Sequence, residues 1–174
     1  MYTNNVHQKR FQKTLAFLNQ NIDKGSHILD LGVQNPMSEL MKASGYKVEN
    51  TQGEDLDEDQ AGLINSNAEV ATAFEILEHL LSPYEVLKSI RAKKLVVSVP
   101  LKIWFSSAYR SKTDLRDRHF HEFEDWQFNW LLEKTGWKIV ASQKWINPPE
   151  SFGIRSLLRY FIPRHYIVYA EKIN

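Results

Sequence analysis

The chain alternates between segments with helical spacing of apolar residues and short, continuous apolar runs. Phe11, Leu15, Leu18 and Ile22 recur every three or four positions, which predicts a helix within residues 1–25. The same spacing predicts further helices at residues 36–45, 83–91 and 125–135. Apolar runs predict strands at residues 27–32, 46–48, 69–74, 95–99, 137–145 and 165–171.

The order of these segments predicts the fold class. Strands that alternate with helices form a mainly parallel sheet with helices on both faces, and Ser82 is a suitable N-cap for the helix at 83–91. The last two strands follow each other across an insertion, which favours an antiparallel edge. We therefore expect one α/β, Rossmann-like domain spanning residues 1–174, with an antiparallel edge at its C-terminal end. Ligands of such sheets bind beyond the carboxyl ends of the strands.

Composition narrows the function classes. The 174 residues are 43% hydrophobic and 25% charged, with a formal net charge of +1, so a protein that coats nucleic acid is disfavoured. The absence of cysteine excludes disulfides, thiolate nucleophiles and Cys-ligated metals. The N-terminus lacks the apolar core of a signal peptide, and no apolar run is long enough to span a membrane, so we expect a cytoplasmic protein.

Four stretches resemble the class I S-adenosylmethionine-dependent methyltransferases. They are HILDLG at 27–32, AEVATAFEILEHL at 68–80, KLVVSVP at 94–100 and HFHEFEDWQFNWLLEKTGWKIV at 119–140. The first is similar to the family's first strand and cofactor turn, the second to its fourth strand with a Glu-His ending, the third to its fifth strand and the last to its C-terminal tail. The resemblance covers nearly the whole chain and implies a methyltransferase that uses S-adenosylmethionine.

The expected cofactor site departs from the family pattern at two points. The first turn has only Gly32 where the family usually has two or three glycines, and the side chain of Gln34 narrows the approach to the cofactor's methionyl part. Gln52 stands where the family has an acid for the ribose hydroxyls, and Asp55, in an acidic run, is the alternative. The cofactor-binding residues that the resemblance implies are Asp30, Gly32, Gln34, Gln52, Asp55 and Phe74.

Glu75, Glu78 and His79 form an E-x-x-E-H cluster directly after the strand at 69–74. On a helical turn these residues share one face, and two carboxylates with an imidazole suit a divalent ion such as Mg²⁺ or Zn²⁺. The cluster is similar to the metal motif of the ubiquinone-pathway O-methyltransferases and the small-RNA 2′-O-methyltransferases, where a later histidine completes the site. His121 fits that position and His119 is the alternative. Glu75, His79 and His121 are also the candidate proton acceptors. Without a metal, Glu75 touches the cofactor and His79 is a packing residue.

Residues 101–123 form a basic and aromatic segment after the strand at 95–99. Its place predicts a lid over the substrate site, and its positive charge favours an acceptor with a phosphate or carboxylate group. An ordinary solvated loop is the alternative. The expected substrate contacts are Trp104, Tyr109, Arg110, Arg116 and Arg118.

Three functions remain open at the level of sequence, and the third, a nucleic-acid binder that uses the loop at residues 102–118, is weakened by the near-neutral net charge. The first is methyl transfer to a small or anionic acceptor, with oxygen favoured by the metal motif. The second is a methyltransferase-like binding or scaffold module that has lost catalysis, which the single-glycine turn and Gln52 favour. Residues 151–163 combine arginines with apolar residues, which predicts either packing on the sheet or peripheral contact with a membrane.

Overall fold

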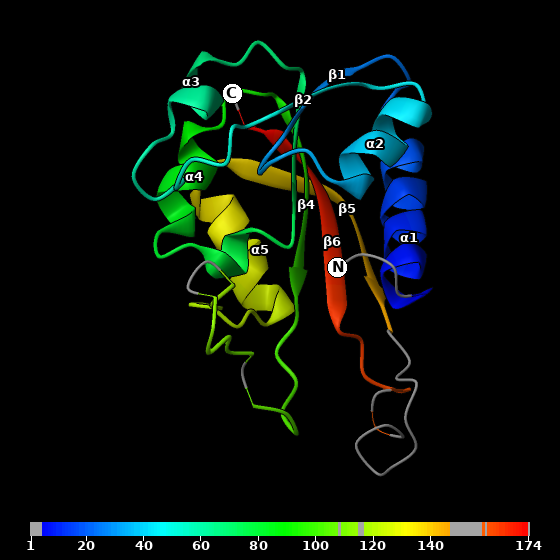
Figure 1. Cartoon of the computed structure of the whole chain (residues 1–174), viewed down its shortest axis with the longest axis vertical. Coiled ribbons are helices and arrows are strands. Elements are labelled where there is room, and N and C mark those ends of the chain that lie inside the picture. Colours follow the sequence, from blue (N-terminus) through cyan, green and yellow to red (C-terminus); the bar gives the residue numbers. More distant parts are fainter. Residues whose placement is uncertain (1–4, 108, 115–116, 147–157, 159, 174) are drawn as a thin grey trace.

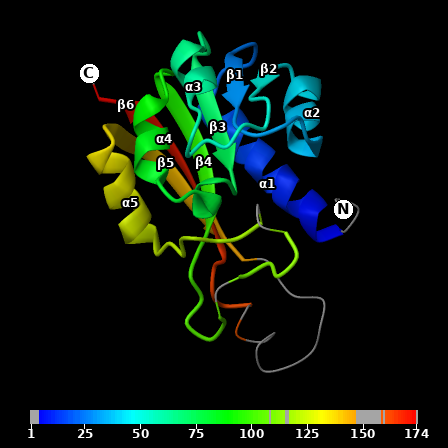
Figure 2. The same ribbon diagram turned by 60° about the vertical axis from the view of Figure 1, so that its left-hand side comes forward.

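The computed structural model describes residues 5–107, 109–114, 117–146, 158 and 160–173. Within them lies a six-stranded sheet of order β2-β1-β3-β4-β6-β5. The first four of these strands are parallel, and β6 runs antiparallel to β4 and β5. Figures 1 and 2 show α1 and α2 on one face of the sheet and α3, α4 and α5 on the other. The expected fold class and the antiparallel C-terminal edge are confirmed.

The elements have the following bounds. The helices are α1 (Asn5–Asn21), α2 (Pro36–Ala43), α3 (Ala61–Asn65), the single 3₁₀ turn η1 (Leu77–His79), α4 (Pro83–Ser89) and α5 (Asp125–Lys134). The strands are β1 (His27–Asp30), β2 (Lys47–Asn50), β3 (Val70–Phe74), β4 (Lys94–Pro100), β5 (Trp137–Trp145) and β6 (His165–Lys172).

Alternate residues of each central strand supply two hydrophobic layers. In β4, Leu95 and Val97 pack toward α4 and α5, whereas Val96 packs toward α1 and α2. Trp137 and Phe128 are the largest fully buried side chains of the first layer. Because β1, β3 and β4 are covered on both faces, their sequences read as continuous apolar runs, which is why the sequence identifies them.

Side chains cap the N-termini of α4 and α2, and in α4 the capping side chain is not the predicted Ser82. Ser82 occupies the N-cap position of α4 but makes no side-chain capping hydrogen bond. Instead, the carboxylate of Asp57 accepts hydrogen bonds from the backbone N–H groups of Leu81 and Ser82, both at 2.8 Å. In α2, Asn35 caps the N–H groups of Met37 and Ser38.

Two other expectations concern membranes. Among the described residues, no helix is long and apolar enough to cross a bilayer. The segment 151–163, expected to pack on the sheet or touch a membrane, lies largely outside the described residues.

Candidate functional site

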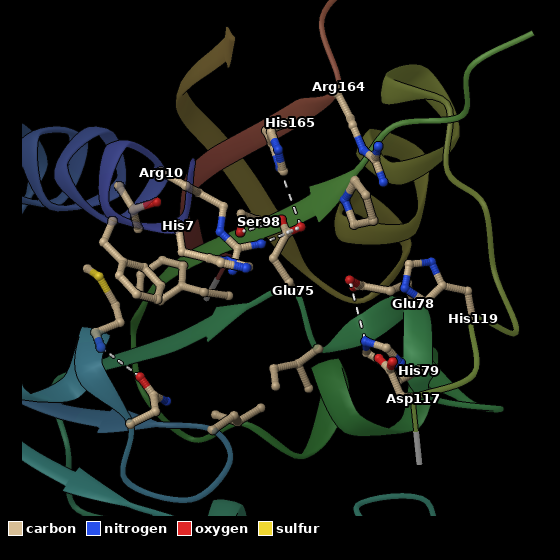
Figure 3. Close-up of a pocket in the computed structure, with 18 of the residues that line it drawn as sticks. His7, Arg10, Glu75, Glu78, His79, Ser98, Asp117, His119, Arg164 and His165 are labelled. Carbon is tan, nitrogen blue, oxygen red and sulfur yellow. Dashed lines mark hydrogen bonds and ion pairs between the residues drawn. The ribbon is translucent and has the colours of Figure 1, made fainter. Parts of the chain in front are cut away.

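A cavity of about 530 Å³ opens at the carboxyl ends of the parallel strands. This volume is within the usual range of small-molecule sites, roughly 300–1,000 Å³. The ends of β1, β3 and β4, the start of β6, helix α1 and the segment after β4 all contribute to its wall. Its lining includes His7, Arg10, Asp30, Phe74, Glu75, Glu78, His79, Asp117, His119, Arg164 and His165. Figure 3 shows the labelled side chains, among them Arg10, Glu75 and His165, converging from separate elements.

Glu75 lies directly after β3 with a backbone φ of 58°, the one positive φ among the described non-glycine residues. The backbone therefore turns sharply here, and Glu75 is not part of the turn that carries Glu78 and His79. Its side chain points instead toward Arg10, Ser98 and His165 (Figure 3). The expectation that Glu75, Glu78 and His79 share one helical face is therefore wrong, because the left-handed residue interrupts the helical register.

Three elements hold the carboxylate of Glu75. Arg10 of α1 donates to Oε2 at 3.3 Å, Ser98 of β4 donates to Oε1 at 3.0 Å, and Nδ1 of His165 lies 3.4 Å from Oε2. Burial acts to raise the pKa of Glu75, but the contact and charge of His165, the charge of Arg10 and the Ser98 hydrogen bond outweigh it, so the pKa is lowered. Glu75 is thus an ionised, firmly positioned carboxylate.

Glu78 differs from Glu75 in its partners and in the direction of its pKa shift. Its side chain is only 1% exposed, and Oε2 has no hydrogen-bond partner among the described residues. Burial, followed by the charge of Glu75, raises the pKa of Glu78 well above its usual value. A buried carboxyl oxygen without a partner is costly unless a ligand, an ion or a proton satisfies it.

His79 and His119 stand beside Glu78. One ligating atom from each of the three residues lies within 4.8 Å of the others, and the two imidazole rings meet edge to face at 4.7 Å. Nδ1 of His79 lies 3.0 Å from the carbonyl oxygen of Arg118, so Nδ1 carries a proton, and Nε2 faces Glu78, with Oε1 at 3.8 Å. Burial and then the charge of His79 lower the pKa of His119, which favours its neutral, ligating form.

The expected metal set is therefore altered by the structure. His121 is not in the group, because its Nε2 lies 3.3 Å from the carbonyl oxygen of Leu81 and its ring stacks on Phe123. Glu75 is also outside it, because it is held by Arg10, Ser98 and His165. The alternative that sequence reasoning kept open, His119, joins Glu78 and His79 instead.

Asp30, at the end of β1, is buried beneath the predicted cofactor turn. It accepts hydrogen bonds from Thr72 at 2.6 Å, Ser38 at 2.8 Å and Asn50 at 3.1 Å, which join β3, α2 and β2 to β1. Burial raises its pKa despite these three donors. Asp30 lines the cavity, and its partners make it a structural anchor of the turn as well.

The rest of the predicted cofactor set divides in two. Phe74 lines the cavity, and Gly32 has a left-handed φ of 93°, with its N–H donating to Oγ1 of Thr51 at 2.8 Å. Gln34, Gln52 and Asp55 are exposed and do not line the cavity, and Gln34 bonds Glu39 instead.

The turns after β1 and β2 pack against each other. A Cβ atom on Gly53 would lie 2.6 Å from the side chain of Val33.

The segment after β4 forms the far wall and a second cavity of about 410 Å³. Tyr109 lines both cavities and hydrogen-bonds Asp117, and Arg110 lines the second one. Arg110 pairs with Arg118 through an isolated antiparallel bridge, which forms a small hairpin. Trp104 is 76% exposed and lines neither cavity. Arg116 lies outside the described residues.

Sequence reasoning missed the contributions of α1 and β6 to the site. His7 and Arg10 come from an amphipathic helix with no motif of its own, and Arg164 and His165 precede an ordinary apolar strand. The signal that could have found His165 is the register of β6 on β4, which pairs it with Pro100 at the carboxyl edge.

The comparisons with known proteins agree with this architecture. No family model and no curated protein matches the sequence. Many solved structures match the fold. One is an S-adenosylmethionine-dependent methyltransferase from Archaeoglobus fulgidus, 14% identical, with a TM-score of 0.65 over 98% of this chain and 96% of that one. Another is the 1,6-didemethyltoxoflavin-N1-methyltransferase of Burkholderia thailandensis, 15% identical, with a TM-score of 0.63 over 97% of this chain and 84% of that one.

These similarities define the class of fold. The mainly parallel sheet with its antiparallel C-terminal strands is the fold of the class I S-adenosylmethionine-dependent methyltransferases. The cyclase SpnF has it too, at 13% identity and a TM-score of 0.59 over 99% of this chain and 86% of that one. The fold alone therefore does not fix the reaction, which has to be argued from the site.

Proposed function

We propose that the protein transfers a methyl group from S-adenosylmethionine to a small-molecule acceptor, with oxygen as the favoured acceptor atom. The observation that carries this proposal is the cavity at the carboxyl edge, which joins the turn after β1 to a cluster of acid–base groups. This edge is where open α/β sheets bind their ligands. The Burkholderia neighbour was solved with S-adenosylhomocysteine and a small-molecule acceptor bound, in line with such a use of the fold.

The residues at the end of β1 fit the methionyl part of the cofactor. Asp30, Leu31, Asn35 and Met37 form one continuous wall of the cavity, and Arg10 supplies a cation that suits a carboxylate. The nucleoside part would lie toward Gln52 or Asp55, and neither of these side chains lines the cavity. We therefore expect weaker cofactor binding than in glycine-rich relatives.

The remaining residues of the site suit methyl transfer. The cofactor supplies an electrophilic methyl group, so the protein mainly has to hold the acceptor oxygen in line with it and exclude water. Glu75 is held by three partners and serves positioning, since a carboxylate of lowered pKa is a weak base. When no ion is bound, His119 is the better proton acceptor, because its lowered pKa keeps it neutral at neutral pH.

We further propose that Glu78, His79 and His119 hold a divalent metal ion. The orphaned Oε2 of Glu78 and the position of His79 Nε2, which faces Glu78, support this, and the backbone contact at Nδ1 of His79 is the usual orientation of a ligating histidine. One carboxylate and two imidazoles favour Zn²⁺, Mn²⁺ or Fe²⁺ over Mg²⁺. A bound ion would lower the pKa of the acceptor hydroxyl.

Calorimetry with S-adenosylmethionine and S-adenosylhomocysteine tests the cofactor. Gly32→Ala should weaken binding several-fold, because Gly32 needs a left-handed backbone and a Cβ there would face Ile76 in the cavity wall. Gly136→Ala is the matched control, since Gly136 has a φ of 87° and lies at the end of α5, away from the cavity. It should lose similar stability without losing cofactor affinity.

Two outcomes would contradict the proposal. Absence of heat at millimolar cofactor would favour the scaffold alternative, in which the fold serves only as a binding module. Equal loss of cofactor binding in Gly32→Ala and Gly136→Ala would show that stability, and not the turn, controls the affinity.

The metal is tested by the two histidines that sequence reasoning left as alternatives. We expect His119→Ala to abolish binding of Zn²⁺ or Mn²⁺ in calorimetry, whereas His121→Ala should leave the affinity within about twofold. If His121→Ala abolishes metal binding and His119→Ala does not, or if the unmodified protein binds no metal, then Glu78, His79 and His119 are not a metal site.

A further inference from the structure

The two cavities are neighbours with a shared wall. Pro100, Tyr109, His119 and Arg164 line both of them. A group bound in the second cavity therefore lies about one side chain away from the first.

The second cavity is markedly cationic. Lys102, Arg110 and Arg164 line it together with a single carboxylate, Glu122. Lys102 is only loosely paired, because its Nζ lies 4.0 Å from Glu124 and both side chains are about half exposed. An ion pair of this kind offsets little of the positive charge.

Backbone hydrogen bonds fix two of these cations next to each other. Leu101 N–H donates to the carbonyl oxygen of Arg164 at 2.6 Å, and Lys102 N–H donates to the carbonyl oxygen of Phe123 at 2.8 Å. Arg164 N–H in turn donates to the carbonyl oxygen of Trp145 at 3.1 Å. Lys102 and Arg164 therefore sit on rigid backbone where β4 ends and β6 begins, and not on a free loop.

The hairpin after β4 adds a third cation. An isolated antiparallel bridge holds the backbone of Arg110 opposite that of Arg118. Of the two, Arg110 lines the second cavity, and Arg118 is exposed and lines neither cavity.

Arg164 connects this charge to the proposed reaction centre. Its side chain extends from the start of β6 toward the side of the cavity that holds Glu78 and His119 (Figure 3). Arg164 and His119 also line both cavities together. The second cavity is therefore separated from Glu78 by about the length of one side chain.

We propose that the second cavity binds the anionic group, phosphate or carboxylate, of a hydroxylated small molecule whose body packs against Tyr109. Arg164 is the main contact, with Arg110 and Lys102 in support. Binding of the anion is independent of catalysis. Its role as part of the methyl acceptor rests on the proposed function, because the hydroxyl would then lie beside His119.

Anion binding is measured directly with phenyl phosphate and benzoate, by calorimetry or by ligand-detected NMR at low salt. We expect both to bind the unmodified protein and to weaken as salt is added. Arg164→Gln should weaken binding about tenfold or more, and Arg110→Gln several-fold, since each removes a charge-assisted hydrogen bond. Arg164→Lys should be intermediate, because it keeps the charge but loses the forked contact.

The matched control is Arg91→Gln, which changes an exposed arginine after α4, at the opposite edge of the sheet. It should bind both anions like the unmodified protein. Thermal unfolding of each variant verifies that it is folded, and Lys102→Gln serves in place of Arg164→Gln if that variant is not.

The outcomes separate this inference from the proposed function. If the unmodified protein binds neither anion, or if Arg91→Gln weakens binding as much as Arg164→Gln, the anion site is overturned. If S-adenosylhomocysteine binds while the arginine variants leave anion affinity unchanged, only the anion site fails. If the cofactors do not bind but phenyl phosphate does so through Arg164, the anion site stands and methyl transfer fails.

Discussion

Glu75 shows how one residue determines the arrangement of the site. A left-handed backbone in a non-glycine residue costs of the order of 1–3 kcal/mol and persists only where the surroundings enforce it. Here Ser98 fixes the residue twice: its carbonyl oxygen accepts the Glu75 N–H at 3.0 Å, and its hydroxyl donates to the side chain. The strained turn sends Glu75 toward α1 and β6 and leaves Glu78 with His79 and His119.

Glu78 leads to a prediction about pH and stability. Its pKa is raised well above 4.5 by burial, so the folded protein binds this proton more tightly than the unfolded chain. The resulting stabilisation is complete below about pH 4.5 and is lost as the pH rises through the folded-state pKa. In the presence of a chelator, we expect the unmodified protein to lose stability relative to Glu78→Gln over that range, by up to about 1.4 kcal/mol per pH unit.

Urea unfolding across this pH range measures the difference. Glu58→Gln changes an exposed acid, so its free energy of unfolding should depend on pH in the same way as that of the unmodified protein. Parallel curves for Glu78→Gln as well would show that Glu78 has no special proton affinity.

At the scale of elements, α4 depends on a side chain far from it in the sequence. Asp57 belongs to the connection between β2 and α3, yet it satisfies the N–H groups of Leu81 and Ser82 at the start of the helix. This contact ties the connection after β2 to the helix that follows the η1 turn, and so stabilises one side of the site.

We therefore expect Asp57→Ala to cost about 0.5–2 kcal/mol of unfolding free energy, the usual value of a capping group. Ser82→Ala should cost much less, because its hydroxyl makes no capping hydrogen bond. Chemical denaturation of both variants checks this. A larger loss of stability in Ser82→Ala than in Asp57→Ala would show that Ser82 caps α4, as the sequence predicts.

At the scale of the whole molecule, the site is assembled from distant parts of the chain. The Arg10–Glu75 ion pair joins residues 65 positions apart and holds α1 over the cavity. The insertion of β6 between β4 and β5 brings Arg164 and His165 beside Pro100. The first cavity depends on both arrangements, because α1 and the start of β6 each line it, whereas the second depends on the start of β6 through Arg164.

The sequence by itself determined the architecture. Continuous apolar runs and helical spacing identified β1, β3, β4, β6 and the longer helices, because burial leaves a strong local pattern. The sequence also predicted β2 and β5, which are less buried. It missed α3 and η1, which are too short to show a period. It also identified Glu78 and His79 and the basic segment after β4, because these residues follow buried strands at the edge where ligands bind.

Only the tertiary structure decided which of these residues meet. In the structure His119, and not His121, lies beside Glu78 and His79, and Glu75 lies apart from Glu78. Arg10, Arg164 and His165 also line the site, although the sequence offered no motif for them. The physical reason is that such contacts depend on one strained backbone angle, on strand register and on the packing of a distant helix. None of these leaves a periodic signal in the residues themselves.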